Sequence, residues 1–201
     1  MTAGERIDGL LAGRRIEALV IGASAGGIEA LLALLPALPA SLKLAVVCIL
    51  HMPPDRESRL AELFGARLLP PVREAADKEA IEPGTIYFAA PGYHLSVEDD
   101  RTFSLSCEPP VHFARPAIDV LMESAADAYG PALAGILLTG ANQDGADGMA
   151  RIKAAGGLTV VQDPDQAQAP TMPEQAIARS TPHLVLRLAE IAALLPKLEG
   201  E

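Results

Sequence analysis

Cysteine is scarce in this sequence of 201 residues, which has only two, Cys48 and Cys107. Cys48 falls inside a run that we expect to be a buried strand, and no metal-ligand spacing connects the two residues. The scarcity excludes a disulfide framework and a cysteine-based metal site. We expect a reduced, cytoplasmic protein that needs no metal and no other cofactor.

Long apolar runs and an excess of basic residues are also missing. No stretch reaches the roughly 18 uninterrupted apolar residues of a membrane span, and residues 1–15 lack the pattern of a secretory signal. The 16 basic residues are outnumbered by 26 acidic ones, for a net charge of -10. Clustered positive charge, which a nucleic-acid surface needs, is therefore not expected. We predict no membrane insertion and no nucleic-acid partner.

What the chain does have is apolar residues, which make up 50% of it, and no internal repeat or low-complexity tract. A chain of this length can bury about 70% of its unfolded surface in a single core. We predict one domain over residues 16–201, preceded by a flexible extension over residues 1–15.

Short runs of Val, Ile and Leu alternate with helical patterns, which is typical of parallel strands buried on both faces. We predict a doubly wound α/β fold with three α/β/α layers. Two alternating segments, 94–98 and 102–107, predict an antiparallel hairpin that interrupts the mostly parallel sheet. The other predicted strands are 17–23, 44–50, 132–138, 158–162 and 183–187, and the main predicted helices are 26–35, 55–65, 116–129 and one ending near residue 155.

A serine, a histidine and an aspartate each follow a different predicted strand. Ser24 lies in a glycine-flanked turn between a strand and a helix, His51 ends the second run, and Asp144 lies in the loop after 132–138. Because ligands bind at the carboxyl ends of strands in such folds, we expect the three side chains to meet. Ser24 would be a nucleophile, His51 its general base and Asp144 the carboxylate that orients the imidazole.

Two backbone amides are candidates for binding the oxyanion that such an attack creates. One is at Ala25, where the helix after Ser24 starts, and the other is in the turn at Gly140 or Ala141. Each of the three side chains also has an ordinary structural interpretation. Ser24 suits a helix N-cap, His51 a strand-end histidine bonded to a carbonyl, and Asp144 a turn residue. Their joint placement at three strand ends favours a catalytic site. We interpret His94, His112 and His183 as structural, and Asp147 as a solvated helix residue.

Several blocks of the sequence, in order from about residue 17 to 190, resemble the catalytic domain of the CheB-type chemotaxis receptor methylesterases. The blocks are Ile21 to Gly27, His51 to Pro53, Arg115-Pro116 with Asp119 to Leu121, Leu138 to Gly140 with Asp144 to Ala146 and Gly148-Met149, and Gln162 to Pro164 with Met172-Pro173. The resemblance implies that Ser24, His51 and Asp144 are the catalytic triad. It also implies hydrolysis of glutamate γ-methyl esters on receptor helices to carboxylate and methanol, often with deamidation of glutamines.

The chain departs from the family pattern at three points. Ala25 stands where many members have threonine, and Ala141 where many have methionine. The family usually carries an N-terminal receiver domain, and about 15 residues cannot form one. We therefore expect an open enzyme, or control by another signalling protein in trans.

The substrate would approach over the face around the triad. We expect the proline-rich loop with Met172 and Pro173 to border it, and basic residues such as Arg56, Arg115 or Arg151 to line it.

Two other classes of protein share some of these features. A different serine hydrolase would use His183 as base, but such enzymes place the nucleophile after several strands and the histidine last. A non-catalytic nucleotide-binding or scaffold domain would use the glycine turn for phosphate, but the Gly-x-Gly-x-x-Gly spacing is missing. This second alternative also leaves His51 and Asp144 without a role.

Overall fold

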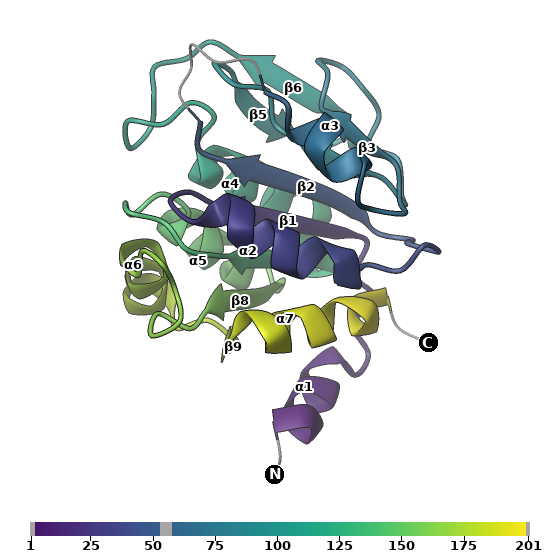
Figure 1. Ribbon diagram of the computed structural model, residues 1–201, viewed down its shortest axis with the longest axis vertical. Coiled ribbons are helices and arrows are strands. Elements are labelled where there is room, and N and C mark those ends of the chain that lie inside the picture. The colour runs from purple at the N-terminus through teal and green to yellow at the C-terminus, as the bar shows by residue number, and fades with distance from the viewer. Residues whose placement is uncertain (1–2, 53–57, 200–201) are drawn as a thin grey trace.

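The continuous runs of Val, Ile and Leu form the strands at the centre of the molecule. The computed structural model describes residues 3–52 and 58–199 (Figure 1). Strands β1 (Ala18–Ala23) and β2 (Ala45–Leu50) are buried along their whole lengths, as expected for strands covered on both faces. Over the described residues the sheet has seven strands in the order β3-β4-β2-β1-β7-β8-β9, and the neighbouring strands are parallel. Its other members are β3 (Val72–Glu74), β4 (Ile86–Phe88), β7 (Leu133–Leu137), β8 (Leu158–Gln162) and β9 (Leu184–Leu186).

Helices cover both faces of this sheet and enclose two apolar cores (Figure 1). On one face lie α2 (Gly27–Leu34), α3 (Leu60–Gly65) and α7 (Leu188–Leu194). On the other lie α4 (Ile118–Tyr129), α5 (Ala146–Ala154) and α6 (Thr171–Ser180). The predicted three-layer, doubly wound architecture is therefore confirmed.

The predicted antiparallel hairpin is also present. It consists of β5 (His94–Val97) and β6 (Phe103–Ser106), which form a separate two-stranded sheet. Leu95 and Phe103 belong to the same core as helix α4, and the Phe103 ring meets the ring of Tyr87 edge to face. The hairpin thus extends the α4 side of the molecule.

Some element boundaries differ from the prediction. The sequence did not predict the short edge strand β3, because one partly buried residue followed by two exposed ones carries almost no periodic signal. Helix α3 begins at Leu60 rather than 55, although residues 53–57 lie outside the described part of the chain. Pro116 precedes α4 instead of starting it, and the N-cap is Ala117. At the C-terminal end, α7 gives way to a 3-10 helix over Leu195–Glu199.

The segment before residue 16, expected to be a flexible extension, is helical over α1 (Ala3–Leu11). Ile7, Leu10 and Leu11 are partly buried against the core, and Lys197 pairs with Asp8 at 2.7 Å. Its flexibility stays a prediction.

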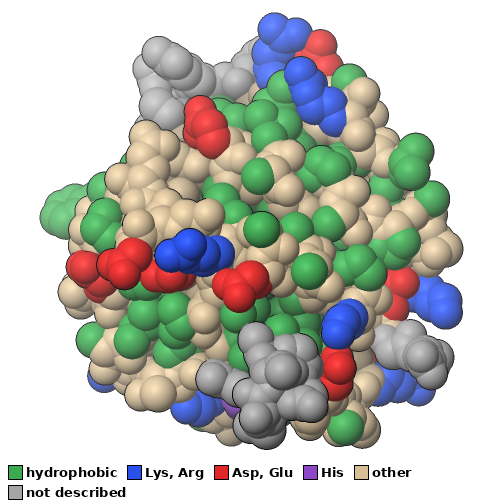
Figure 2. Space-filling model, turned by 60° about the horizontal axis from the view of Figure 1, so that its bottom comes forward, with side chains coloured by type: hydrophobic (Ala, Val, Ile, Leu, Met, Phe, Trp, Pro, Cys, Tyr) green, Lys and Arg blue, Asp and Glu red, His purple; other side chains and the backbone are tan. Residues whose placement is uncertain are grey.

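Acidic and basic side chains are interspersed on the face of the molecule drawn in Figure 2. None of the helices in the described ranges is both long and apolar enough to cross a membrane.

Candidate active site

The carboxyl ends of β1, β2 and β7 lie side by side because their registers align there. Ala23 pairs with Leu50, and Gly22 pairs with Leu137. After β1 the chain first forms β2, β3 and β4 on one side of β1, and later forms β7, β8 and β9 on the other side. The strand order therefore reverses between β1 and β7, and the carboxyl ends of these two strands mark the topological switch point. Beyond the strands, the His51 N–H donates to Ala23 O at 3.1 Å and the Ser24 N–H donates to Thr139 O at 2.9 Å. The residues that follow the three strands are therefore held together by main-chain bonds.

Ser24 does not act as the helix N-cap that its position suggested. The N-cap of α2 is Gly26, whose φ of 77° lies in the left-handed region that suits glycine. The Ser24 carbonyl closes the turn by accepting the Gly27 N–H at 2.8 Å. Among the hydrogen bonds of the described residues, none involves Ser24 Oγ. The hydroxyl is thus left available for chemistry.

Asp144 contacts His51 and is completely buried. Its Oδ2 lies 2.7 Å from His51 Nε2, and its side chain has 0% exposure against 13% for that of His51. The same carboxylate accepts the N–H groups of Ile118 at 2.7 Å and Asp119 at 2.9 Å. These are the first two residues of α4, so Asp144 satisfies the N-terminus of a helix distant in sequence, not that of α5, whose N-cap is Gly145.

The environment keeps Asp144 ionised despite its burial. Desolvation raises the pKa of this carboxyl, but the hydrogen bond from His51 and the two backbone N–H groups outweigh that effect, and the net pKa is lowered. A carboxylate only accepts hydrogen bonds, so His51 Nε2 must carry the proton. The other ring nitrogen, Nδ1, is then free to accept a proton.

The loops around Ser24 are fastened by Thr139, which is 1% exposed. Its hydroxyl donates to Ala25 O at 2.8 Å and accepts the Ala169 N–H at 2.9 Å, and its own N–H donates to Gln162 Oε1. The amides of Ala25 and Ala141, the two oxyanion candidates, donate to none of the described residues. Thr139 and Gln162 are positioning residues to which the sequence pattern gave no role of their own.

The expectation that Met172 borders the substrate path is wrong. Met172 is fully buried and packs against Gly140, where an added Cβ would meet Met172 Cε at 2.5 Å. Met172 is the second residue of α6, and it packs against the Thr139-Gly140 turn instead of facing the substrate path.

Arg115 does lie near the site. It lines a pocket of about 210 Å³ together with His51, and it is fixed by bonds from Nη1 to the carbonyls of Cys107 and Glu108. Arg151 lies in the last turn of α5 and pairs with Asp127, away from the strand ends, and Arg56 falls outside the described residues.

Two of the remaining histidines are structural, as expected. His94 is buried, with Nε2 3.1 Å from Pro109 O and Nδ1 accepting the Ala117 N–H. His183 contacts Thr159, near the amino end of β8, so it does not take part in the site. Burial lowers its pKa, and nearby cations add to the effect. The alternative with His183 as the base is therefore excluded by position.

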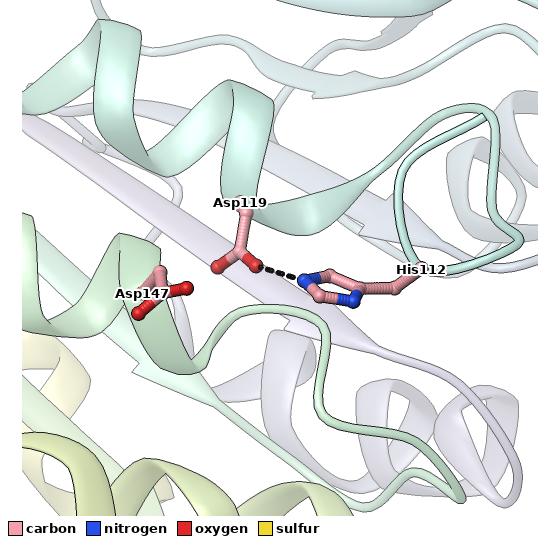
Figure 3. A group of neighbouring side chains, drawn as sticks. All are labelled: His112, Asp119 and Asp147. Atoms are coloured by element: carbon pink, nitrogen blue, oxygen red, sulfur yellow. Dashed lines mark ion pairs between the residues drawn. The ribbon is translucent and has the colours of Figure 1, made fainter. Parts of the chain in front are cut away.

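His112 lies beside the site. The sequence did not indicate this, because His112 is in an irregular segment. It lines the same pocket as His51, and its Nε2 lies 3.3 Å from Asp119 Oδ2 (Figure 3). The available signal was its place three residues before the Arg115-Pro116 block. Asp147, expected to be solvated, lies close to this pair, as Figure 3 shows, and is bound by Arg179.

His112, Asp119 and Asp147 are the one group of possible metal ligands found among the described residues, with ligand atoms within 4.8 Å of one another. Each carboxylate already has a partner, since Asp119 accepts the Gly148 N–H and pairs with His112, and Asp147 pairs with Arg179. Asp119 thus joins the His112 loop and α5 to α4, and the pair of Asp147 with Arg179 joins α5 to α6.

A doubly wound sheet with a serine, a histidine and a buried aspartate at its switch point has the arrangement of a serine hydrolase. The chain belongs to the CheB methylesterase family, whose model matches residues 19–195. It is similar to a putative protein-glutamate methylesterase/protein-glutamine glutaminase of Leptospira interrogans, with 43% identity over 91% of this chain and 95% of that protein.

It is also similar to the protein of that name from Symbiobacterium thermophilum, with 36% identity over 91% of this chain and 51% of the relative. Among solved structures, the Thermotoga maritima CheB methylesterase catalytic domain matches with a TM-score of 0.86 and 30% identity. That match covers 91% of this chain and 98% of the other. The fold predicted by resemblance is therefore shared by a solved family member.

Proposed function

We propose that the protein is a protein-glutamate methylesterase in which Ser24, His51 and Asp144 form the catalytic triad. The observation that carries the proposal is the contact between His51 Nε2 and the buried Asp144 carboxylate. This contact fixes the tautomer of His51 in which Nδ1 is the basic nitrogen. His51 is also held near Ser24, because its backbone N–H donates to the carbonyl of Ala23, the residue before Ser24.

The reaction follows from these positions. Ser24 Oγ attacks the carbonyl carbon of a glutamate γ-methyl ester while His51 Nδ1 takes its proton. The amides of Ala25 and Ala141 stabilise the negative charge on the carbonyl oxygen. Collapse of the intermediate expels methanol, which receives the proton from His51, and leaves a glutamyl ester on Ser24. Water, deprotonated by His51, then attacks the acyl carbon, the bond to Ser24 Oγ breaks, and Oγ takes the proton back from His51 as the glutamate carboxylate leaves. A glutamine side chain would react in the same way and release ammonia.

The substrates are methylated helices of chemotaxis-type receptors. This choice rests on the family, because hydrolysis alone does not distinguish a protein-borne ester from a small one. The test is to incubate the purified chain with receptor membranes that carry radioactive methyl groups and to count the released methanol.

Ser24→Ala and His51→Ala should each remove nearly all methanol release, because nucleophile and base act as one unit. Asp144→Asn should leave the protein folded and lower turnover on the order of 10³- to 10⁴-fold, because the wrong tautomer of His51 is favoured. Ser180→Ala, at the far end of α6, serves as a matched control and should behave as the wild type. Near-normal turnover in Ser24→Ala would exclude covalent catalysis by this serine.

A further inference from the structure

The pocket beside His51 is too small for the substrate as a whole. Its volume is about 210 Å³, and small-molecule sites are usually about 300 to 1,000 Å³. A helix with its side chains is about 10 Å wide. The pocket can therefore take one ester-bearing side chain, and the helix that carries it must lie across the rim.

Phe113 forms part of that rim and is fully exposed. Its relative exposure is 104%, whereas Phe64, Phe88 and Phe103, the other phenylalanines, are completely buried. Phe113 lines the His51 pocket and also a second hollow of about 420 Å³, formed with Thr171 and Gln175. The ring thus stands between two depressions, where a helix lying over the site would meet it.

The segment that carries Phe113 is held firmly. His112 and Phe113 have φ values of 49° and 64°, a left-handed conformation that is unfavourable for residues with a side chain. His112 is bound by Asp119, Gln143 Nε2 contacts its ring at 3.1 Å, and Val111 and Ala114 exchange backbone hydrogen bonds of 3.1 and 2.8 Å. An exposed aromatic side chain on a fixed backbone offers much contact area, and the segment that carries it loses little entropy on binding.

We propose that Phe113 is the aromatic contact that holds the substrate helix over the catalytic site, so that it determines specificity for protein-borne esters. The inference rests on the proposed function and adds to it the surface that recognises the helix. The face of the helix that meets Phe113 would bear an apolar side chain one helical turn from the methylated glutamate.

The test compares Phe113→Ala with the wild type on two substrates, methylated receptor membranes and a small glutamate γ-methyl ester. On the receptor, kcat/KM should fall about tenfold to a hundredfold. The fall should come mainly from a higher KM, because the ring contacts the helix equally in the bound substrate and in the transition state. On the small ester, which has no helix for the ring to contact, kcat/KM should fall much less than on the receptor. Phe113→Leu, which keeps an apolar side chain, should recover much of the lost activity on the receptor.

The matched control is Leu69→Ala, which removes another large apolar side chain that is 80% exposed. Leu69 precedes the amino end of β3, so it lies at the opposite edge of the sheet from the site. It should match the wild type on both substrates. Unchanged receptor kinetics in Phe113→Ala would overturn the inference and leave the proposed function intact. An equal loss on both substrates would also overturn it, because Phe113 would then act on the site itself. If the wild type releases no methanol from the receptor, the proposed function fails, and this inference fails with it.

Discussion

Asp144 combines two tasks in one buried carboxylate, since it orients His51 and completes the N-terminus of α4. Its neighbour Asp119 is buried as well and accepts the Gly148 N–H at 2.7 Å. The pKa of Asp119 is raised to about 6, first by desolvation and then by the charges of Asp144 and Asp147, while the Gly148 N–H and His112 act in the opposite direction. Two neighbouring acids thus have pKa values shifted in opposite directions, that of Asp144 lowered by its hydrogen bonds and that of Asp119 raised mainly by burial.

Asp119 should lower the stability of the native protein at neutral pH. Its folded-state pKa lies above the ordinary value of 3.8, so the native state gains stability as the pH falls through about 6 toward 4. Asp119→Asn removes the charge and keeps an oxygen for the Gly148 N–H. We expect a higher midpoint of thermal unfolding than that of the wild type at pH 7 to 8, and a difference that shrinks below about pH 6.

Thermal unfolding followed by circular dichroism between pH 4 and pH 8 measures this difference. The control is Asp165→Asn, which alters an exposed carboxylate and should show no such pH dependence. A difference for Asp119→Asn that is constant with pH, or a loss of stability at pH 8, would contradict the assignment.

The geometry of the site depends on how closely helix α4 approaches strand β1. A Cβ at Gly22 would lie 2.5 Å from Ile118 Cγ2 and 3.0 Å from Leu137 Cδ1. Ile118 is the first residue of α4, and its N–H holds Asp144. The glycine in β1 therefore lets the N-terminus of α4 reach the Asp144 carboxylate.

Gly22→Ala should impair catalysis more than stability. The added methyl group pushes Ile118 away from β1, and overpacking of this kind costs about 1 to 3 kcal/mol. The displaced N–H moves Asp144 and His51, and a misplacement of about 1 Å can lower the rate on the order of 10²-fold. Hydrolysis of a small ester, measured well below the unfolding temperature, reports the effect.

The matched control is Gly135→Ala in β7, where a Cβ would lie 2.5 Å from Ile152 Cδ1 in α5. It overpacks the same core without touching Ile118, so it should lose similar stability and keep its turnover. Equal losses of turnover in both variants would mean that the approach of α4 has no special role.

These elements also set the limit of prediction from the sequence. The buried runs that became β1, β2 and β7 place Ser24, His51 and Asp144 at one edge, since parallel strands share the direction of their ends. The contact of His51 with Asp144 follows from that, whereas the catalytic roles stay predictions. The partners of Asp144 in α4, the burial of Met172 and the place of His112 depend on packing between distant segments. Short stretches of the sequence do not show which distant segments pack together.

For the whole molecule, the site occupies one edge of the sheet and the N-terminal segment another. Helix α1 packs beside the C-terminal residues, where Lys197 meets Asp8, and Arg14 donates to Gly156 O before the amino end of β8 (Figure 1). The carboxyl ends of the strands, which bear the candidate triad, point away from these contacts. Stability and catalysis should therefore respond differently to the loss of α1.

Removal of residues 1–12 should lower stability and leave catalysis unchanged. The deletion uncovers part of the core beneath Ile7, Leu10 and Leu11, so the midpoint of thermal unfolding should fall. Because no described contact joins α1 to the strand ends, kcat/KM on the small ester and on the receptor should remain within about twofold of the full chain at 25 °C. Unfolding curves and methanol release measured on the same preparations test both parts. A selective loss on the receptor would assign the N-terminal segment to substrate binding, and a loss on both substrates in a folded protein would show that the two edges of the sheet are coupled.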